Sequence, residues 1–129
     1  MILLDTQATA WLAYEPDKLS RAANTAIVQA RKETGIAISD KTLWELAMMF
    51  SRKRIDIGMD LLEFLRETEH FCTVLPVNSA IAARSVQFGK SFPSDPADRI
   101  IAATAIVYGL PLVTADVQIR KSGEVQCIW

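Results

Sequence analysis

The sequence predicts an α/β fold: a three-layer α/β/α sandwich with a central parallel sheet of about five strands. Short apolar runs alternate with helical stretches along the chain, as expected when helices join parallel strands. These runs are continuously apolar, which is typical of strands buried on both faces of a sheet. No linker, repeat or low-complexity segment interrupts the 129 residues, so we expect one domain spanning residues 1–129.

In the first half of the chain, the predicted helices have recognisable boundaries. Pro16 ends the first helix, because proline cannot continue one. The second helix is amphipathic and ends before Gly35, a residue common just past a helix C-terminus. Ser39 or Asp40 can cap the third helix, which carries Glu45. The predicted elements are strand 2–4, helix 6–14, helix 19–33, strand 36–38 and the helix containing Glu45.

The second half continues the alternation of strands and helices. Leu61, Leu62 and Leu65 form the apolar stripe of one helix. The Gly109-Leu110-Pro111 segment turns the chain out of the longest apolar helix and into a strand. The predicted elements are helix 59–69, strand 71–75, helix 79–88, helix 96–108, strand 112–114, helix 117–121 and strand 125–128.

Composition narrows the possible functions. The formal net charge of −1 provides no strong field for nucleic acid, so any RNA or DNA contact requires a local patch. Cys72 and Cys127 lie in apolar stretches without CxxC spacing, and we expect both to be reduced. A single histidine, His70, excludes multi-histidine metal sites.

The sequence contains no targeting or membrane segment that we recognise. Asp5 interrupts the N-terminal apolar run after three residues, unlike a signal peptide. No apolar run approaches the ~20 residues that span a bilayer. We therefore expect a soluble cytoplasmic protein with no membrane partner.

Four carboxylates are predicted to gather at one edge of the sheet, where open α/β sheets bind ligands. Asp5 directly follows the first strand, and Asp116 almost directly follows the fourth. Glu45 lies in the first turns of the helix after the second strand. Asp98 lies in the first turn of helix 96–108.

Each carboxylate also has a purely structural explanation. Asp5 and Asp116 can cap the helices that they precede. Asp95 can cap helix 96–108, which places Asp98 where an acidic residue favours the helix dipole. Glu45, in the apolar stretch LWELAMMF, can form an ion pair with a lysine on its helix or just beyond it, Lys41 or Lys53.

Considered together, the carboxylates favour a metal site. Four acidic groups at one edge repel one another and raise one another's pKa. A divalent cation would neutralise them, and carboxylate oxygens suit Mg²⁺ or Mn²⁺. Such ions support hydrolysis of a phosphodiester by activated water. The pattern therefore predicts a metal-dependent phosphodiesterase.

The chain resembles the PIN domain family, and within it the VapC-type toxins of bacterial type II toxin–antitoxin pairs. The segments that carry the resemblance are LLDTQATAWL, WELAMM, SDPADRIIAATAIVYGLPLVTAD and the closing IW. The resemblance implies a PIN-like sandwich and a Mg²⁺- or Mn²⁺-dependent endoribonuclease. It further implies an RNA substrate, a cognate small antitoxin and a homodimer.

The resemblance also assigns roles to individual residues. The family's acidic quartet, expected to be catalytic and to hold the metal, matches Asp5, Glu45, Asp98 and Asp116. Asp116 matches the most variable of the four and can act through water. The residues expected to support the site are Thr6, Thr114 and Asp95. The chain departs from the family at Phe92-Pro93-Ser94, where a histidine-containing turn is common.

A substrate that carries phosphates requires a basic rim around the acidic centre. The candidate rim residues are Arg52, Lys53, Arg54, Lys90, Arg99, Arg120 and Lys121. Trp11, Trp44 and Trp129 could stack on bases, although packing in the core or at an interface is the prediction for each.

Other functions remain open at this point. One is a non-catalytic PIN-like module that only binds a partner. A second is cleavage of DNA by the same chemistry, because a metal site does not distinguish the sugars. Phosphoryl transfer through Asp5 is disfavoured, since the DxD pattern is absent after the first strand. A Walker-type NTPase is excluded by the absence of GxxxxGK[ST].

Overall fold

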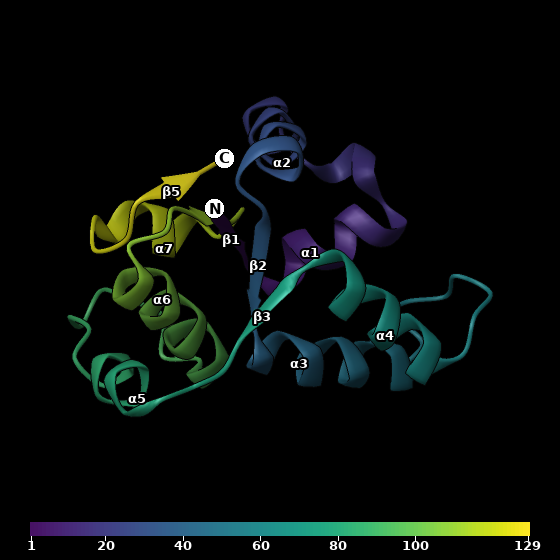
Figure 1. The fold of residues 1–129 in the computed structure, drawn as a ribbon. Coiled ribbons are helices and arrows are strands. Elements are labelled where there is room, and N and C mark those ends of the chain that lie inside the picture. Colours follow the sequence, from purple (N-terminus) through teal and green to yellow (C-terminus); the bar gives the residue numbers. More distant parts are fainter.

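The computed structural model describes residues 1–129 (Figure 1). The elements in chain order are β1 (Ile2–Leu4), α1 (Thr6–Tyr14), a 3₁₀ turn (Pro16–Lys18), α2 (Arg21–Glu33), β2 (Ile36–Ser39), α3 (Asp40–Ser51), α4 (Leu61–Phe71), β3 (Thr73–Leu75), α5 (Ser79–Ser85), α6 (Pro96–Tyr108), β4 (Leu112–Val113), α7 (Val117–Ser122) and β5 (Cys127–Ile128).

The five strands form one parallel sheet in the order β3-β2-β1-β4-β5. The central strand, β1, pairs Leu4 with Ile38 of β2 and with Val113 of β4. All three residues of β1 are buried, as the continuous apolar run predicted. The predicted fold class, a five-stranded parallel α/β/α sandwich, is confirmed.

Two core clusters lie on opposite faces of this sheet, because successive strand residues point to opposite sides. Leu4 and Ile38 pack with Ile27 of α2 on one face. Leu3 packs with Ile101 of α6 and Ile119 of α7 on the other. Figure 1 shows this division, with α2 on one side of the sheet and α5, α6 and α7 on the other.

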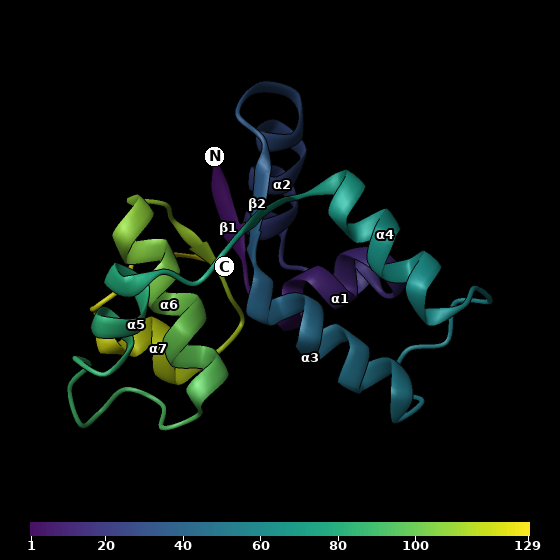
Figure 2. The same cartoon turned by 60° about the horizontal axis from the view of Figure 1, so that its bottom comes forward.

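A third cluster does not cover a face of the sheet. Leu46 of α3, Phe64 of α4 and Ala10 of α1 pack together with Ile55, which lies in the loop before α4. In Figure 2, α3 and α4 run beside α1, away from the helices α5, α6 and α7. A pocket lies between α1 and α3 on one side and the start of α6 on the other, at the carboxyl ends of the strands.

Several predicted boundaries shift by a few residues. The helix predicted from 19 begins at Arg21, because the Ser20 hydroxyl caps it by accepting from the Ala23 amide. The helix predicted at 59–69 occupies 61–71, because Asp60 is its N-cap. The other ranges that differ are strand 36–38, observed as 36–39, strand 71–75, observed as 73–75, helix 79–88, observed as 79–85, strand 112–114, observed as 112–113, helix 117–121, observed as 117–122, and strand 125–128, observed as 127–128.

Three smaller predictions also have an outcome. Both cysteines are free thiols, as expected; Cys72 is buried and Cys127 is half-buried. Ser39, rather than Asp40, caps α3. None of the helices has the length and apolar character to span a membrane.

Candidate active site

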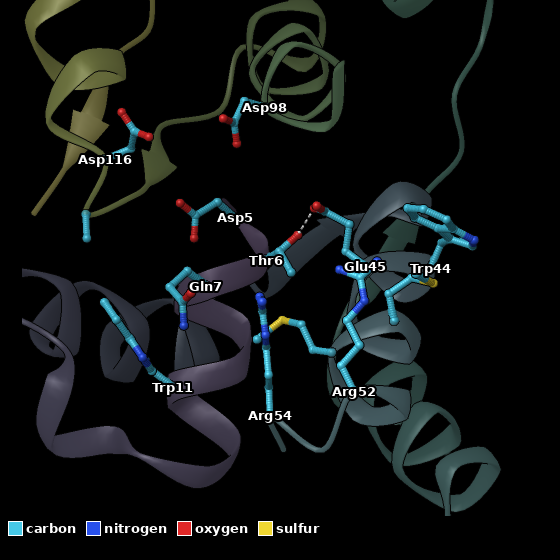
Figure 3. Close-up of a pocket in the computed structure, with 13 residues that line it drawn as sticks. Asp5, Thr6, Gln7, Trp11, Trp44, Glu45, Arg52, Arg54, Asp98 and Asp116 are labelled. Atoms are coloured by element: carbon cyan, nitrogen blue, oxygen red, sulfur yellow. Dashed lines mark hydrogen bonds between the residues drawn. The ribbon is translucent and has the colours of Figure 1, made fainter. Parts of the chain in front are cut away.

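An acidic pocket of about 560 Å³ opens at the carboxyl ends of the strands. All four carboxylates of the predicted quartet line it, from four different elements of the fold (Figure 3). The lining residues are Asp5, Thr6, Gln7, Trp11, Trp44, Glu45, Met48, Met49, Arg52, Arg54, Asp98, Ala115 and Asp116.

Strand pairing brings Asp5 and Asp116 to the same edge. The Asp5 amide donates to the Val113 carbonyl of the neighbouring strand at 3.1 Å. Each carboxylate also caps the helix after its strand: Asp5 accepts from the Ala8 amide at 2.7 Å, and Asp116 from the Ile119 amide at 2.9 Å. The structural and the functional interpretation thus both apply, because each cap uses only one carboxylate oxygen and both side chains line the pocket.

Glu45 enters the pocket from α3. Its Oε1 accepts a hydrogen bond from the Thr6 hydroxyl, across 39 residues of chain. The alternative ion pair with Lys41 or Lys53 is wrong, since neither lysine forms a salt bridge. The Lys41 ammonium lies instead over the Trp44 ring, 4.0 Å from its centroid. Thr6 therefore fixes where this carboxylate points.

Asp98 reaches the pocket from the first turn of α6. Asp95 caps this helix as predicted, its side chain accepting from the Asp98 amide at 3.0 Å. Burial and, to a smaller extent, the neighbouring charges of Asp95, Asp116, Glu45 and Asp5 together raise the pKa of Asp98 to about 7.

Asp5 is perturbed in a similar way. Burial is the main cause that raises its pKa, hydrogen bonds from Thr114 and the Ala8 amide oppose the rise, and the charges of Asp116 and Glu45 add to it; the net pKa is about 6. The pocket therefore carries more negative charge than its surroundings stabilise.

The donor chemistry of the pocket fits a hard divalent cation. Carboxylate oxygens are the ligands that Mg²⁺ and Mn²⁺ prefer, and a cation would offset the burial and the repulsion that raise the pKa values of Asp5 and Asp98. No three acidic, histidine or cysteine side chains are grouped tightly enough to coordinate one ion together. Mg²⁺ commonly keeps several waters and takes only one or two protein carboxylates, which suits this spread arrangement.

The other residues predicted for the site fall into two groups. Thr6 lines the pocket, and the buried Thr114 hydroxyl accepts from the Asp116 amide at 3.1 Å. Arg52 and Arg54 also line the pocket. Lys53, between them, does not line the pocket, and its backbone is left-handed, with a φ of 57°.

The four remaining rim candidates lie outside the acidic pocket. Arg99 donates from Nε to the Pro93 carbonyl at 2.8 Å and so braces the segment before α6. Arg120 lines a separate hollow with Cys127 and Trp129. Lys90 and Lys121 are likewise absent from the acidic pocket.

The analysis of the sequence did not single out Gln7 or Met48 for the site. Gln7 follows Thr6 on the exposed side of the first turn of α1, so its position next to Asp5 was the available signal. Met48 lies one turn after Glu45 on α3, so this spacing on one helix was the available signal.

Comparison with known proteins gives consistent matches over nearly the whole chain. Residues 2–124 match the PIN domain family. Ribonuclease VapC22 of Mycobacterium tuberculosis is 36% identical over 120 residues, covering 93% of this chain and 90% of that protein.

Solved structures share the fold. The VapBC2 complex of Rickettsia felis, bound to a DNA fragment from its promoter, matches with a TM-score of 0.75 and 16% identity over 98% of this chain and 97% of that one. The DNA-bound VapBC complex of Salmonella typhimurium matches with a TM-score of 0.74 and 19% identity over the same shares of the two chains. At these identities, the likeness shows the fold alone.

Proposed function

This chain belongs to the PIN domain family, and from that membership and its acidic pocket we propose that it is a metal-dependent endoribonuclease, the toxin of a type II toxin–antitoxin pair. The observation that carries the proposal is the convergence of Asp5, Glu45, Asp98 and Asp116 on one pocket. The similarity to a protein named as a ribonuclease supports RNA as the substrate.

An antitoxin partner is part of this proposal. Several solved structures with the same fold are described as VapBC or toxin–antitoxin complexes, among them one from Klebsiella pneumoniae with a TM-score of 0.65. We expect a small protein to bind this chain and inhibit it. Homodimerisation stays a prediction, which light scattering of the purified protein would test.

The proposed chemistry is hydrolysis by water. A Mg²⁺ or Mn²⁺ ion held by the carboxylates would activate that water and stabilise negative charge on the phosphoryl group. Asp5 and Asp98 are the principal ligands in this proposal. Burial and nearby negative charges make their ionised forms unfavourable, and a bound cation would stabilise those forms. Thr6 fixes the direction of the third carboxylate, Glu45.

The positions of hydrogen-bond donors suit this assignment. The Ala8 amide and Thr114 donate hydrogen bonds to Asp5, and the Ile119 amide donates one to Asp116, so both side chains are held in fixed positions. Preorganised ligands lose little freedom when an ion or substrate arrives.

The alternatives have less support. A non-catalytic module has no need for four carboxylates in one pocket, because their repulsion costs stability. A DNA nuclease would use the same site, and only a contact to the 2′-hydroxyl would separate the two substrates. The ribonuclease name of the 36% identical relative favours RNA.

The test is cleavage of total RNA supplemented with tRNA by purified protein in Mg²⁺, Mn²⁺ or EDTA. We expect cleavage only with a metal, and none by Asp98→Asn. The matched control is Asp60→Asn, which makes the same change at the N-cap of α4, outside the pocket. Equal cleavage by Asp98→Asn and Asp60→Asn, or cleavage undiminished in EDTA, would contradict the proposal. Single-stranded DNA of matched sequence tests the alternative substrate.

A further inference from the structure

Trp44 is an aromatic side chain that no core of the protein uses. It is 56% exposed, and it packs against none of the three core clusters. It nevertheless lines the acidic pocket, one residue before Glu45. Trp11, on the opposite side of the pocket, is different: its ring lies 5.8 Å from that of Trp129 and packs against the first cluster. The position of Trp44 at the rim of the pocket therefore indicates a role in function rather than in folding.

The Trp44 ring is held in position on one side only. The Lys41 ammonium lies 4.0 Å from its centroid, one helical turn earlier, at a distance typical of a cation–π contact. No aromatic ring or second cation pairs with the indole, and more than half of the residue is exposed at the pocket, which leaves ring surface for a ligand. A flat ring fixed beside a phosphodiester-cleaving centre suits a nucleic-acid base.

Two arginines complete this side of the pocket. At the end of α3, the Lys53 amide donates to the Phe50 carbonyl at 3.0 Å and the Arg54 amide to the Met49 carbonyl at 2.9 Å. This double hydrogen bond is a Schellman motif, with Lys53 in the left-handed conformation. It turns the chain back, and both Arg52 and Arg54 line the pocket.

Neither guanidinium is neutralised within the protein. Arg52 and Arg54 form no salt bridge, although carboxylates line the same pocket. Figure 3 shows both side chains extending from the end of α3 toward the carboxylates, with Trp44 above Arg52. Unpaired guanidinium groups at this position are suited to bind phosphate oxygens through two hydrogen bonds each.

We propose that Trp44, Arg52 and Arg54 form a nucleotide subsite beside the carboxylates. The base of a nucleotide adjacent to the cleaved bond stacks on Trp44, and its flanking phosphates bind the two arginines. The inference rests on the proposed nuclease function, because it places the scissile phosphate at the carboxylates. It makes Trp44 a specificity-determining residue and requires that base to be unpaired, since a base within a duplex does not expose its face.

Binding can be measured separately from cleavage. Fluorescence anisotropy of a labelled oligouridine would be followed with Asp98→Asn protein in Mg²⁺, so that the RNA stays intact. Adding Trp44→Ala should raise Kd about 5- to 150-fold, and Trp44→Phe should restore most of the affinity, because phenylalanine still stacks. Leu62→Ala is the matched control: Leu62 is 55% exposed, but lies on α4 outside the pocket.

The arginines are tested by salt dependence. Removing one phosphate contact should lower the slope of log K against log salt by about 0.7 for a single strand. We expect this change for Arg52→Ala and for Arg54→Ala. Arg66→Ala, which removes the same charge from α4, should leave the slope unchanged.

The outcomes separate this inference from the proposed function. Equal Kd values for Trp44→Ala and Leu62→Ala, or no binding of the oligouridine, would overturn the subsite even if the wild-type protein cleaves RNA. Trp44-dependent binding would support the subsite even if no cleavage occurred, and the nuclease proposal would then fail alone. In active protein, Trp44→Ala should raise KM much more than it lowers kcat.

Discussion

Individual carboxylates in this protein serve two purposes at once. Asp5 and Asp116 each cap a helix with one oxygen and line the acidic pocket. Asp98 has no capping role of its own, and its amide is satisfied by Asp95. The raised pKa of Asp98 therefore reflects how unfavourable its ionised form is when no cation is nearby.

This cost predicts how stability depends on pH when metal is absent. The pKa of Asp98 is about 7 in the fold and 3.8 in an unfolded chain, so between these values the folded state holds a proton that the unfolded state has released. In EDTA, stability is therefore lost as pH rises through this window. Asp98→Asn, which has no charge to lose, should melt at a higher temperature than wild type above pH 7, and the difference should vanish near pH 4.

The melting temperatures of both proteins above pH 7 are then measured again with Mn²⁺ in place of EDTA. A ligand that binds only the folded state raises its melting temperature, so wild type should gain more than Asp98→Asn does. Equal gains for both proteins would mean that the cation binds elsewhere. Differential scanning fluorimetry with and without EDTA supplies both comparisons.

The four carboxylates of the site were predicted from the sequence, but the hydrogen bond that orients Glu45 was not. Each lies next to a strand end or a helix start, and such local patterns are readable along the chain. The partner of Glu45 is Thr6, 39 residues away, and nothing local distinguishes it from the nearby lysines. The correct partner follows only from the packing of α1 beside α3.

At the scale of elements, the end of α3 is the least relaxed point of the backbone. Lys53 is the only residue other than glycine with a positive φ. Such a conformation costs a residue with a Cβ about 1–2 kcal/mol, a cost that glycine avoids. The turn persists because two backbone hydrogen bonds and the buried Ile55 that follows determine the path of the chain.

Substitution of Lys53 should reveal this strain. Lys53→Gly is expected to raise the free energy of unfolding by up to about 1 kcal/mol, and Lys53→Val to lower it, because β-branched residues tolerate this conformation poorly. Urea denaturation of the three proteins measures both effects. A lower stability for the glycine variant than for the valine variant would contradict the assignment of the turn.

Helices with clear capping residues, prolines or glycines at their ends were predicted with the correct first and last residues. Helix α1 lies between Asp5 and Pro16, and α6 between Pro96 and Gly109, and both match their predicted ranges. Edge strands were predicted too long. Strand β5 keeps only two residues of four, because its extent depends on the ladder with β4, itself two residues long.

For the molecule as a whole, β1 is the strand that contributes buried residues to the core on both faces of the sheet. Leu4 is fully buried in the first core cluster, and Leu3 in the second. Leu4→Ala should lower the free energy of unfolding by about 2–5 kcal/mol, because it leaves a cavity beneath α2. Leu62→Ala, at an exposed site, should change it by no more than about 0.5 kcal/mol. Comparable losses for the two variants would contradict the central position of β1.

The sheet followed from the alternation of elements, whereas the placing of α3 and α4 did not. Their cluster joins Ala10, Leu46, Ile55 and Phe64, which are far apart in sequence. An amphipathic pattern shows that a helix buries one face, but not which neighbour covers it. The acidic pocket depends on this packing, so the sequence suggested Arg52, Arg54 and Trp44 but could not separate them from the rim candidates that lie outside the pocket.

The double use of Asp5 and Asp116 bears on how this protein can be inactivated genetically. Asparagine caps a helix about as well as aspartate, whereas alanine does so poorly. A change to asparagine would remove a charge from the pocket and spare the fold, and it requires only the exchange of one oxygen for an amide nitrogen. If the active protein arrests growth, as we propose, cells that escape it should carry such asparagine alleles and accumulate a folded, inactive product that still binds its antitoxin.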